Sequence, residues 1–362
     1  MNIRIIGAGS IGIHHSRAAV EYGCAVSVED LSPEALARFP EIYAKRYGAW
    51  NNEVRLGGPS DEQADIVIIG TPPDSHLALA IKVLESANRP KVLMIEKPLC
   101  SPTDDLGPFL QAVKSHPETK VLVGFNHLLA ANSELTRKLM GTGDIGALVN
   151  LTSEVRSHWQ NIFAAHPWLS GPEDTYLGYW KRGGGAGGEH SHAINLWIHF
   201  AEVAGMGRPA DVSASIQYVD HKGATYDSIF LANVTTEKGL LGTIAQDVVT
   251  TPTKRKAVEL QFESAHITWL NDVSKTADEV QFEKKGVPAE KHPLEKTRVE
   301  EFAREMKHMM GIASGEIAYE SSPIHLKNGI YSSLLLTAAH KSAAEKKTVP
   351  VDYSLWDMHF PK

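Results

Sequence analysis

The chain has 362 residues, which is long for a single hydrophobic core, so we expect two domains. Its hydrophobic content of 43% and charged content of 22% are typical of a globular protein in water. The net charge of −7 argues against nucleic acid or an anionic membrane as the main partner, and no apolar run reaches the ~20 residues that span a bilayer.

The chain begins directly with an apolar strand pattern and shows no signal-peptide pattern. Its cysteines, Cys24 and Cys100, fit neither a disulfide framework nor a metal-ligand spacing. We therefore predict a cytoplasmic protein without a bound metal.

A glycine-rich turn at residues 7–12 is the most informative motif of the sequence. It follows the apolar run at residues 3–6 and precedes a predicted helix at 13–22, which is the context of a dinucleotide-binding turn. Gly7 permits the turn, Gly9 lets the backbone approach a pyrophosphate, and Gly12 lets helix and strand pack closely. The predicted cofactor contacts of this turn are Gly7, Gly9, Ser10, Ile11 and Gly12.

An acidic pair follows the second predicted strand at residues 25–28, about 20 residues after the glycine turn, as a dinucleotide site requires. We expect Asp30 to accept hydrogen bonds from the adenosine ribose and to repel a 2′-phosphate, which favours NAD over NADP. Glu29, one residue earlier, is the alternative candidate for binding the ribose. A turn-forming aspartate before Ser32 is the purely structural alternative.

The first 125 residues alternate buried-strand patterns with helical ones. Further strands are predicted at 65–70, 91–95 and 120–124, with helices ending at 84 and covering 103–115. This order predicts an α/β domain at residues 1–125, a doubly wound parallel sheet of the Rossmann type.

The pattern changes beyond residue 125 to longer alternating strands, which indicate a large, mostly antiparallel open sheet in an α+β domain at residues 126–362. Strands are predicted at 148–156, 210–219, 228–235, 239–250, 258–263 and 266–270. Helices are predicted at 133–140, 189–204, 297–314 and 325–346. We expect the charged segment 279–296 to be a solvated edge and loop.

Several signatures occur together in a fixed order. They are the glycine turn, Asp30, the Thr-Pro-Pro-Asp-Ser-His run at 71–76, Glu96-Lys97-Pro98, and the glycines at 183–185 before 189–195. With them the chain resembles the glucose–fructose oxidoreductase / inositol dehydrogenase / MocA (Gfo/Idh/MocA) family over nearly its full length. The resemblance implies NAD(P)-dependent oxidoreduction of sugars, nucleotide sugars or cyclitols, and a homodimer or homotetramer joined through the C-terminal sheet. It also implies cofactor contacts at Thr71, Pro72, Pro73, His76, Glu96 and Lys97.

Three residues are the candidates for catalysis. Lys97 ends a sheet strand, where open α/β sheets bind ligands, and its ammonium can stabilise charge on a reacting oxygen. His192 can act as a general base, with Glu189 three residues earlier on the same helical face to orient it. The alternatives are a surface lysine and a buried structural histidine. In the resembling family an aspartate usually precedes the histidine by about a turn and another acidic residue follows it, where this chain has Glu189 and Asn195.

Residues 156–182 are rich in aromatic and polar side chains, which suit sugar rings because C–H faces stack on aromatics while hydroxyls find polar partners. The aromatic residues are Trp159, Phe163, Trp168, Tyr176, Tyr179 and Trp180. We predict substrate contacts at Lys97, Asn126, Arg156, Trp159, Trp180 and His192, with a core or subunit interface as the alternative for the aromatic residues.

The leading hypothesis is therefore an NAD(P)-dependent dehydrogenase or reductase of a sugar-like secondary alcohol. One alternative is a non-catalytic NAD(P)-binding sensor of the same fold, since fold alone does not determine function. Another is a redox-neutral lyase or hydrolase that recycles its bound NAD.

Overall fold

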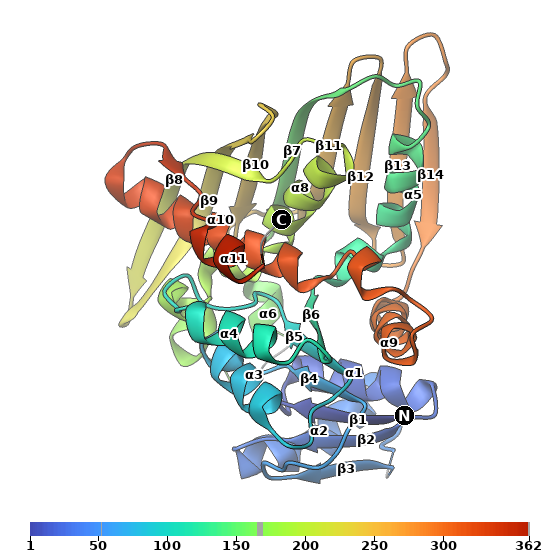
Figure 1. The fold of residues 1–362 in the computed structure, drawn as a ribbon, viewed down its shortest axis with the longest axis vertical. Coiled ribbons are helices and arrows are strands. Elements are labelled where there is room, and N and C mark those ends of the chain that lie inside the picture. The colour runs from blue at the N-terminus through green and yellow to red at the C-terminus, as the bar shows by residue number, and fades with distance from the viewer. Residues whose placement is uncertain (52, 165–168, 361–362) are drawn as a thin grey trace.

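The computed structural model describes residues 1–51, 53–164 and 169–360. Two sheets organise these residues, a six-stranded one built from the N-terminal third and a nine-stranded one built from the remainder (Figure 1). The smaller sheet forms the lower part of the view and the larger sheet the upper part, with helices between them.

The smaller sheet has the strand order β3-β2-β1-β4-β5-β6, and all its neighbouring pairs are parallel. This confirms the predicted doubly wound sheet. Strand β4 and residues 92–95 of β5 are continuous apolar runs, buried throughout, as in sheets covered by helices on both faces. The strands are β1 (Asn2–Ile6), β2 (Ala25–Glu29), β3 (Val54–Gly57), β4 (Ile66–Ile69), β5 (Val92–Glu96) and β6 (Lys120–Gly124).

The helices of this part are α1 (Ser10–Glu21), α2 (Pro33–Tyr47), α3 (His76–Glu85) and α4 (Gly107–Ser115). Helix α2 and strand β3 were not predicted from the sequence, although Ser32 caps α2 by accepting a hydrogen bond from the Ala35 amide. Helix α4 begins four residues after its predicted start.

The larger sheet has the order β14-β13-β12-β11-β7-β10-β9-β8-β15, in which only the β7–β10 pair is parallel. The predicted large antiparallel sheet is confirmed. Its strands are β7 (Leu148–Arg156), β8 (Pro209–His221), β9 (Ala224–Thr236), β10 (Leu241–Asp247), β11 (Arg255–Phe262), β12 (Ala265–Ser274), β13 (Ala277–Lys284), β14 (Glu290–Glu295) and β15 (Val349–Pro350).

The prediction of an edge and loop at 279–296 is partly wrong. The segment supplies most of β13 and all of β14, and β13 pairs on both sides. Asp278 and Val280 of β13 are buried while the residues between and after them are less so, a two-residue alternation that the many charged side chains obscure in the sequence.

Helices α8 (His192–Val203) and α10 (Leu326–Glu345) cover one face of this sheet. The helix predicted at 189–204 is in fact two helices, because a short α7 (Gly185–Glu189) ends before α8 begins. The helix α9 (Arg298–Ser314) returns to the smaller sheet and packs along α1 (Figure 1). The remaining helices are α5 (Ala131–Met140), α6 (Gln160–Ala164) and α11 (Ser354–His359).

No helix in the described ranges is long and apolar enough to cross a membrane. Cys24 and Cys100 are both buried and free.

Candidate active site

The glycine turn connects β1 to α1 and has the geometry of a phosphate cradle. Gly7 has a φ of 117°, and a Cβ atom on Gly12 would lie 2.1 Å from the Gly7 carbonyl oxygen, so both positions require glycine. A Cβ on Gly9 would meet no atom within 4 Å, which leaves open space above the turn. Because α1 starts at Ser10, its free amides are available to an anion there. The turn therefore fits a dinucleotide pyrophosphate.

The structure separates the two acidic residues after β2. Asp30 lies beside the turn, where its carboxylate accepts hydrogen bonds from the amides of Ala8 (2.7 Å) and Ser32 (2.8 Å). Glu29 is buried and pairs with Arg4 at 3.2 Å. This pairing excludes Glu29 as the ribose-facing residue, so Asp30 remains the predicted ribose ligand.

An arginine that the sequence analysis did not connect with the turn reaches it from the end of α2. The Arg46 guanidinium donates to Ser10 Oγ at 2.8 Å and contacts the Ser10 carbonyl oxygen at 3.3 Å. Their separation of 36 positions in the sequence explains why no local pattern predicted this contact.

The Thr71–His76 run forms a short 3₁₀ helix, η1 (Pro73–Ser75), at the carboxyl end of β4. His76 is fully buried, and its ring nitrogens lie 2.7 Å from the Thr71 carbonyl oxygen and 3.0 Å from that of Pro98. His76 therefore fixes the Thr71-Pro72 loop against the segment that carries Lys97. Its predicted role in cofactor binding can only be indirect, through this positioning.

Lys97 meets the C-terminal part of the chain at the end of β5. Its ammonium donates to the Glu189 carbonyl oxygen at 2.8 Å and to the Glu189 carboxylate at 3.3 Å. Burial alone would raise the pKa of Glu189, but the charge of Lys97 holds it below the ordinary value. Glu189 therefore stays ionised as the counterion of Lys97.

The expected pairing of Glu189 with His192 is wrong. The two residues belong to different helices, since His190 and Ser191 interrupt the chain between α7 and α8. The ring of His192 instead stacks on His127, with centroids 4.0 Å apart and planes 18° from parallel.

Burial, the neighbouring His127 ring and the charge of Lys97 together lower the pKa of His192 well below its ordinary value. Burial and the charges of Lys256 and Lys296 do the same for the pKa of His127. The two stacked imidazoles are therefore neutral at physiological pH, and a neutral imidazole can accept a proton.

Glu96 belongs to a second group of buried ionisable residues directly behind Lys97. Its carboxylate accepts a hydrogen bond from the Lys97 amide (3.2 Å) and lies 2.7 Å from His15 Nε2. Glu305 of α9 lies 4.0 Å from the same nitrogen. Burial and the charge of Glu96 raise the pKa of Glu305 well above its ordinary value.

The ligand atoms of His15, Glu96 and Glu305 lie close enough together to hold a metal ion. Among the described residues, this is the one such group of His, Cys, Asp and Glu side chains. The 2.7 Å contact between His15 and Glu96 is that of a direct hydrogen bond. The geometry therefore suits a shared proton, and the group supports the Lys97 backbone.

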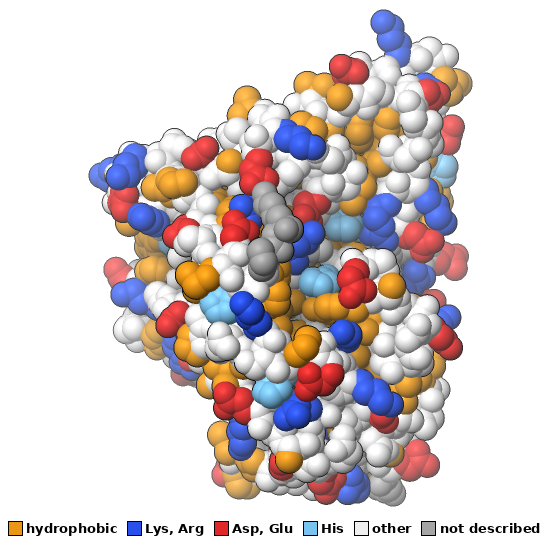
Figure 2. All heavy atoms as spheres, in the orientation of Figure 1, with side chains coloured by type: hydrophobic (Ala, Val, Ile, Leu, Met, Phe, Trp, Pro, Cys, Tyr) orange, Lys and Arg blue, Asp and Glu red, His pale blue; other side chains and the backbone are white. Residues whose placement is uncertain are grey.

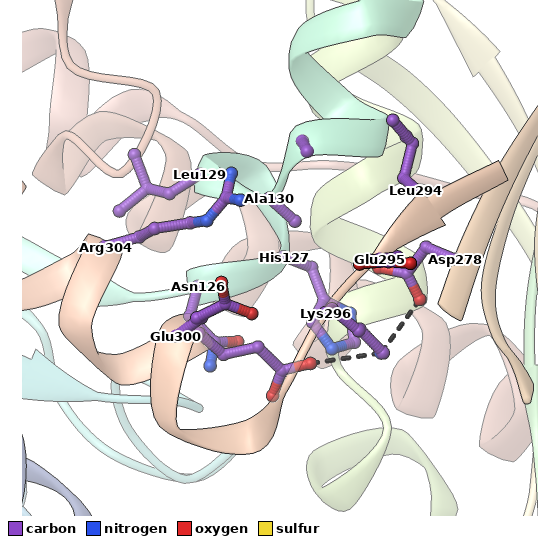
Figure 3. Close-up of a pocket in the computed structure, with 12 residues that line it drawn as sticks. Asn126, His127, Leu129, Ala130, Asp278, Leu294, Glu295, Lys296, Glu300 and Arg304 are labelled. Atoms are coloured by element: carbon purple, nitrogen blue, oxygen red, sulfur yellow. Dashed lines mark hydrogen bonds and ion pairs between the residues drawn. The ribbon is translucent and has the colours of Figure 1, made fainter. Parts of the chain in front are cut away.

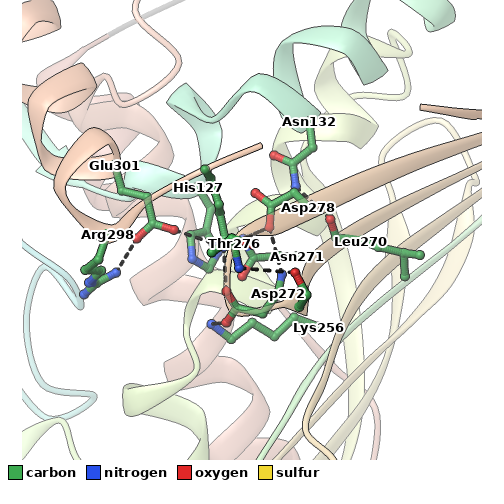
Figure 4. Close-up of polar contacts among 12 residues, drawn as sticks. His127, Asn132, Lys256, Leu270, Asn271, Asp272, Thr276, Asp278, Arg298 and Glu301 are labelled. Atoms are coloured by element: carbon green, nitrogen blue, oxygen red, sulfur yellow. Dashed lines mark hydrogen bonds and ion pairs between the residues drawn. The ribbon is translucent and has the colours of Figure 1, made fainter. Parts of the chain in front are cut away.

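Lys256 of β11 is a site residue that the sequence analysis missed. Its ammonium lies 3.0 Å from the Asp272 carboxylate, and its charge adds to the effects of burial and of Lys97 that lower the pKa values of His190 and His192. Figure 4 shows it beside Asp272, below His127. Lys256 shares the alternation of buried side chains on β11 with Val258, Leu260 and Phe262, and a lysine in such a position was the signal available in the sequence.

Other predicted substrate residues border this region. Arg156 pairs with Asp247 at 2.7 Å, and the charge of Asp247 partly opposes the lowering of the His190 pKa by burial.

Asn126 begins η2 (Asn126–Leu129) and lines a narrow pocket with His127 and Lys296, where η2, β14 and α9 meet (Figure 3). Figure 2 shows histidine, basic and acidic side chains gathered along the recess between the two parts of the molecule.

The two tryptophans predicted to contact substrate pack in two different places. Trp159 is buried against Tyr226, with ring centroids 4.5 Å apart. Trp180 stacks on His340 of α10 and lines a different cavity, of about 590 Å³, with Tyr218. Trp168 lies outside the described residues. The core alternative therefore describes Trp159 better than substrate contact does.

Residues 1–125 match the GFO_IDH_MocA family, described as an oxidoreductase family with an NAD-binding Rossmann fold. This part of the chain belongs to the Gfo/Idh/MocA family. No curated protein sequence matches the chain significantly.

The whole chain shares its fold with solved structures of low sequence identity. Levoglucosan dehydrogenase in complex with NADH and levoglucosan has a TM-score of 0.76 at 18% identity, over 97% of this chain and 99% of that one. The WlbA dehydrogenase of Bordetella pertussis in complex with NADH and UDP-GlcNAcA has a TM-score of 0.73 at 20% identity, over 97% of this chain and 98% of that one. A putative myo-inositol dehydrogenase of Sinorhizobium meliloti has a TM-score of 0.70 at 21% identity, over 97% of this chain and 100% of that one. These likenesses establish the two-part fold.

Proposed function

We propose that the protein is an NAD(P)-dependent dehydrogenase or reductase that acts on a secondary alcohol or ketone of a sugar, nucleotide sugar or cyclitol. The observation that carries this proposal is the contact of Lys97, from the end of β5, with Glu189, in the segment that also brings His192 to the site. The similar folds named above include dehydrogenases crystallised with NADH and sugar-like ligands, which supports the same substrate class here.

The bound nicotinamide would supply the hydride acceptor or donor. Lys97 donates a hydrogen bond to the reacting oxygen and stabilises negative charge that develops on it. His192 accepts the hydroxyl proton during oxidation and returns it during reduction, which its neutral ground state favours in the oxidative direction. Glu189 accepts hydrogen bonds from Lys97 and orients its ammonium, so we assign it a positioning role.

We infer a preference for NAD over NADP. The Asp30 carboxylate beside the turn would repel a 2′-phosphate, while its oxygens suit ribose hydroxyls. Arg46 is the nearby cation, but it is already bonded to Ser10. Its position supports a role in fixing the start of α1 rather than in binding a 2′-phosphate.

We also propose that residues 1–125 and 126–362 are the cofactor and substrate domains, with α9 as a tie between them. The outer face of the larger sheet, which carries the exposed Leu231 (45%) and Leu241 (61%), is our candidate for association into a homodimer or homotetramer.

The test is a screen of sugars, nucleotide sugars and cyclitols with NAD⁺ and NADP⁺, followed by nicotinamide absorbance. The Lys97→Ala variant should lose nearly all activity toward any compound that the unaltered chain turns over. Lys91→Ala is the matched control, since Lys91 precedes the same strand and pairs with Asp65 on the surface. NADH binding without hydride transfer to any compound would favour the sensor. Product formation without net NADH release would favour the redox-neutral alternative.

A further inference from the structure

A cavity of about 590 Å³ lies at the junction of the two parts of the chain. Pro102 and Thr103 border it from the part that carries the smaller sheet, and η5 (Trp180–Arg182), β8, β9 and α10 border it from the other part. The described residues that line it include neither Lys97 nor His192. Its volume lies in the range of roughly 300–1,000 Å³ that is typical of small-molecule sites, which are frequent where domains meet.

Hydrogen bonds between segments far apart in the sequence hold the walls of this cavity together. Thr337 Oγ1 of α10 donates to the Pro102 carbonyl oxygen at 3.1 Å. Thr103 Oγ1 donates to the Lys181 carbonyl oxygen at 3.0 Å. The cavity is therefore bounded by elements that the fold fixes relative to one another.

Aromatic rings form one side of the cavity. Trp180 stacks on His340 of α10, with ring centroids 4.4 Å apart and planes 16° from parallel. Tyr218 of β8 is tilted against both rings and is still 38% exposed. Trp180 is also only partly covered by protein. Aromatic surface is therefore open to a ligand that enters the cavity.

His340 adds a polar group without a partner to this side of the cavity. Its side chain is only 5% exposed, and burial lowers its pKa to about 4, so the ring is neutral. Nδ1 lies 2.7 Å from the Tyr218 hydroxyl, whereas Nε2 has no hydrogen-bond partner in the described part of the chain. Because buried polar atoms are normally hydrogen-bonded, a ligand group in the cavity is the natural partner for Nε2.

We propose that this cavity is a carbohydrate-binding site separate from the reaction site, in which the C–H face of a sugar ring packs on Trp180 and Tyr218 and a ring hydroxyl bonds to His340 Nε2. A hydroxyl both donates and accepts, so it suits either tautomer of the imidazole and the threonine oxygens of the lining. Lys181 and Lys341 can donate to further hydroxyls. A purely aromatic ligand would leave most of these polar groups without partners.

The test uses the full chain labelled with 5-fluorotryptophan and followed by ¹⁹F nuclear magnetic resonance without nicotinamide cofactor. The Trp180→Phe variant identifies the Trp180 resonance among those of the seven tryptophans. Glucose, galactose, mannose, maltose and cellobiose are titrated in turn, and at least one of them should shift the Trp180 resonance to saturation. The resonance of Trp50, which packs between Phe39 and Tyr43, should not move and serves as the internal control.

Variants then locate the binding. His340→Leu should weaken it by about twofold to tenfold, the effect of one neutral hydrogen bond. His266→Leu, on β12 and far from β8 in the strand order, is the matched control and should leave it unchanged. Tyr218→Ala, at a partly exposed position, should weaken binding by tenfold or more and tests the same surface if His340→Leu does not fold. Lys97→Ala should leave the Trp180 response intact.

The proposal is overturned when no saccharide shifts the Trp180 resonance, or when Lys97→Ala abolishes the shift, because the signal would then come from the reaction site. A response to adenosine or indole but to no saccharide would also overturn it. Loss of self-association in the Tyr218→Ala variant, without any saccharide response, would assign the cavity to a subunit interface instead. A saccharide response in a chain that transfers no hydride would support the cavity site while removing the proposed dehydrogenase function.

Discussion

Asp227 offers a quantitative test of how the segment that carries Glu189 is held. It lies on β9, is fully buried, and accepts a hydrogen bond from the Gly187 amide of α7 at 2.6 Å. Its other carboxylate oxygen has no hydrogen-bond partner among the described residues. Burial raises the pKa of Asp227 from 3.8 to about 7, against the opposing effect of the Gly187 amide.

The sign of the linkage follows from the raised value. Between pH 4 and 7 the folded state holds a proton on Asp227 that the unfolded state has released, so the free energy of unfolding falls as the pH rises. Below this window both states are protonated, and above it both are ionised. The shift from 3.8 to about 7 corresponds to roughly 4 kcal/mol when complete, at about 1.4 kcal/mol per pKa unit.

The Asp227→Asn variant removes the titration and keeps an oxygen that can accept the Gly187 hydrogen bond. Urea unfolding from pH 4 to 8 should show it becoming progressively more stable relative to the unaltered chain, by about 2–4 kcal/mol across the window. Asp211→Asn, at an exposed position on β8, is the matched control and should show no such trend. A constant stability difference between Asp227→Asn and the unaltered chain at all pH values would refute the reasoning.

Four further predictions concern the cofactor and the reaction. Gly9→Val should abolish NADH binding in a fluorescence titration while the circular dichroism stays unchanged, because the new side chain enters open space rather than the protein core. Asp30→Ser combined with Leu31→Arg should shift the ratio of NADPH to NADH affinity upward, since Leu31 is 86% exposed beside the predicted ribose site; tighter binding of NADPH by the unaltered chain would contradict this assignment. Lys97→Ala and His192→Ala should each lower kcat by ~10²–10⁴-fold with NADH binding nearly intact. The lowered pKa of His192 should keep the oxidation rate constant down to a pH below the ordinary histidine range, and an acid limb near pH 7 would count against it.

The sequence predicted the fold well where local patterns are strong. The glycine turn and the continuous apolar runs of β4 and β5 identify buried parallel strands because burial on both faces requires such runs. It failed at β13, where charged side chains obscure the alternation, and at the break between α7 and α8. Nothing local marks that break, because residues 189–192 continue a plausible helical pattern. The glycines before them pack closely against other elements, and those contacts cannot be seen in the sequence.

The candidate site shows the same division between local and long-range information. Lys97 was predictable because its position at the end of a strand is a local property, whereas its partner Glu189 lies 92 residues away. The assignment of Glu189 to His192 assumed a continuous helix. Once that helix is broken, the carboxylate is free to pair with Lys97, and His192 is left to stack on His127.

This exchange of partners changes the chemistry rather than only the geometry. A histidine paired with a carboxylate would be held toward its protonated form, whereas His192, buried among cations, is held neutral. Lys97 in turn gains Glu189 as its counterion. The site therefore places a lysine with its own carboxylate partner, directly after β5, in the same region as a neutral imidazole on α8. Each residue was found from a local pattern, but its partner is set by the packing of segments far apart in the sequence.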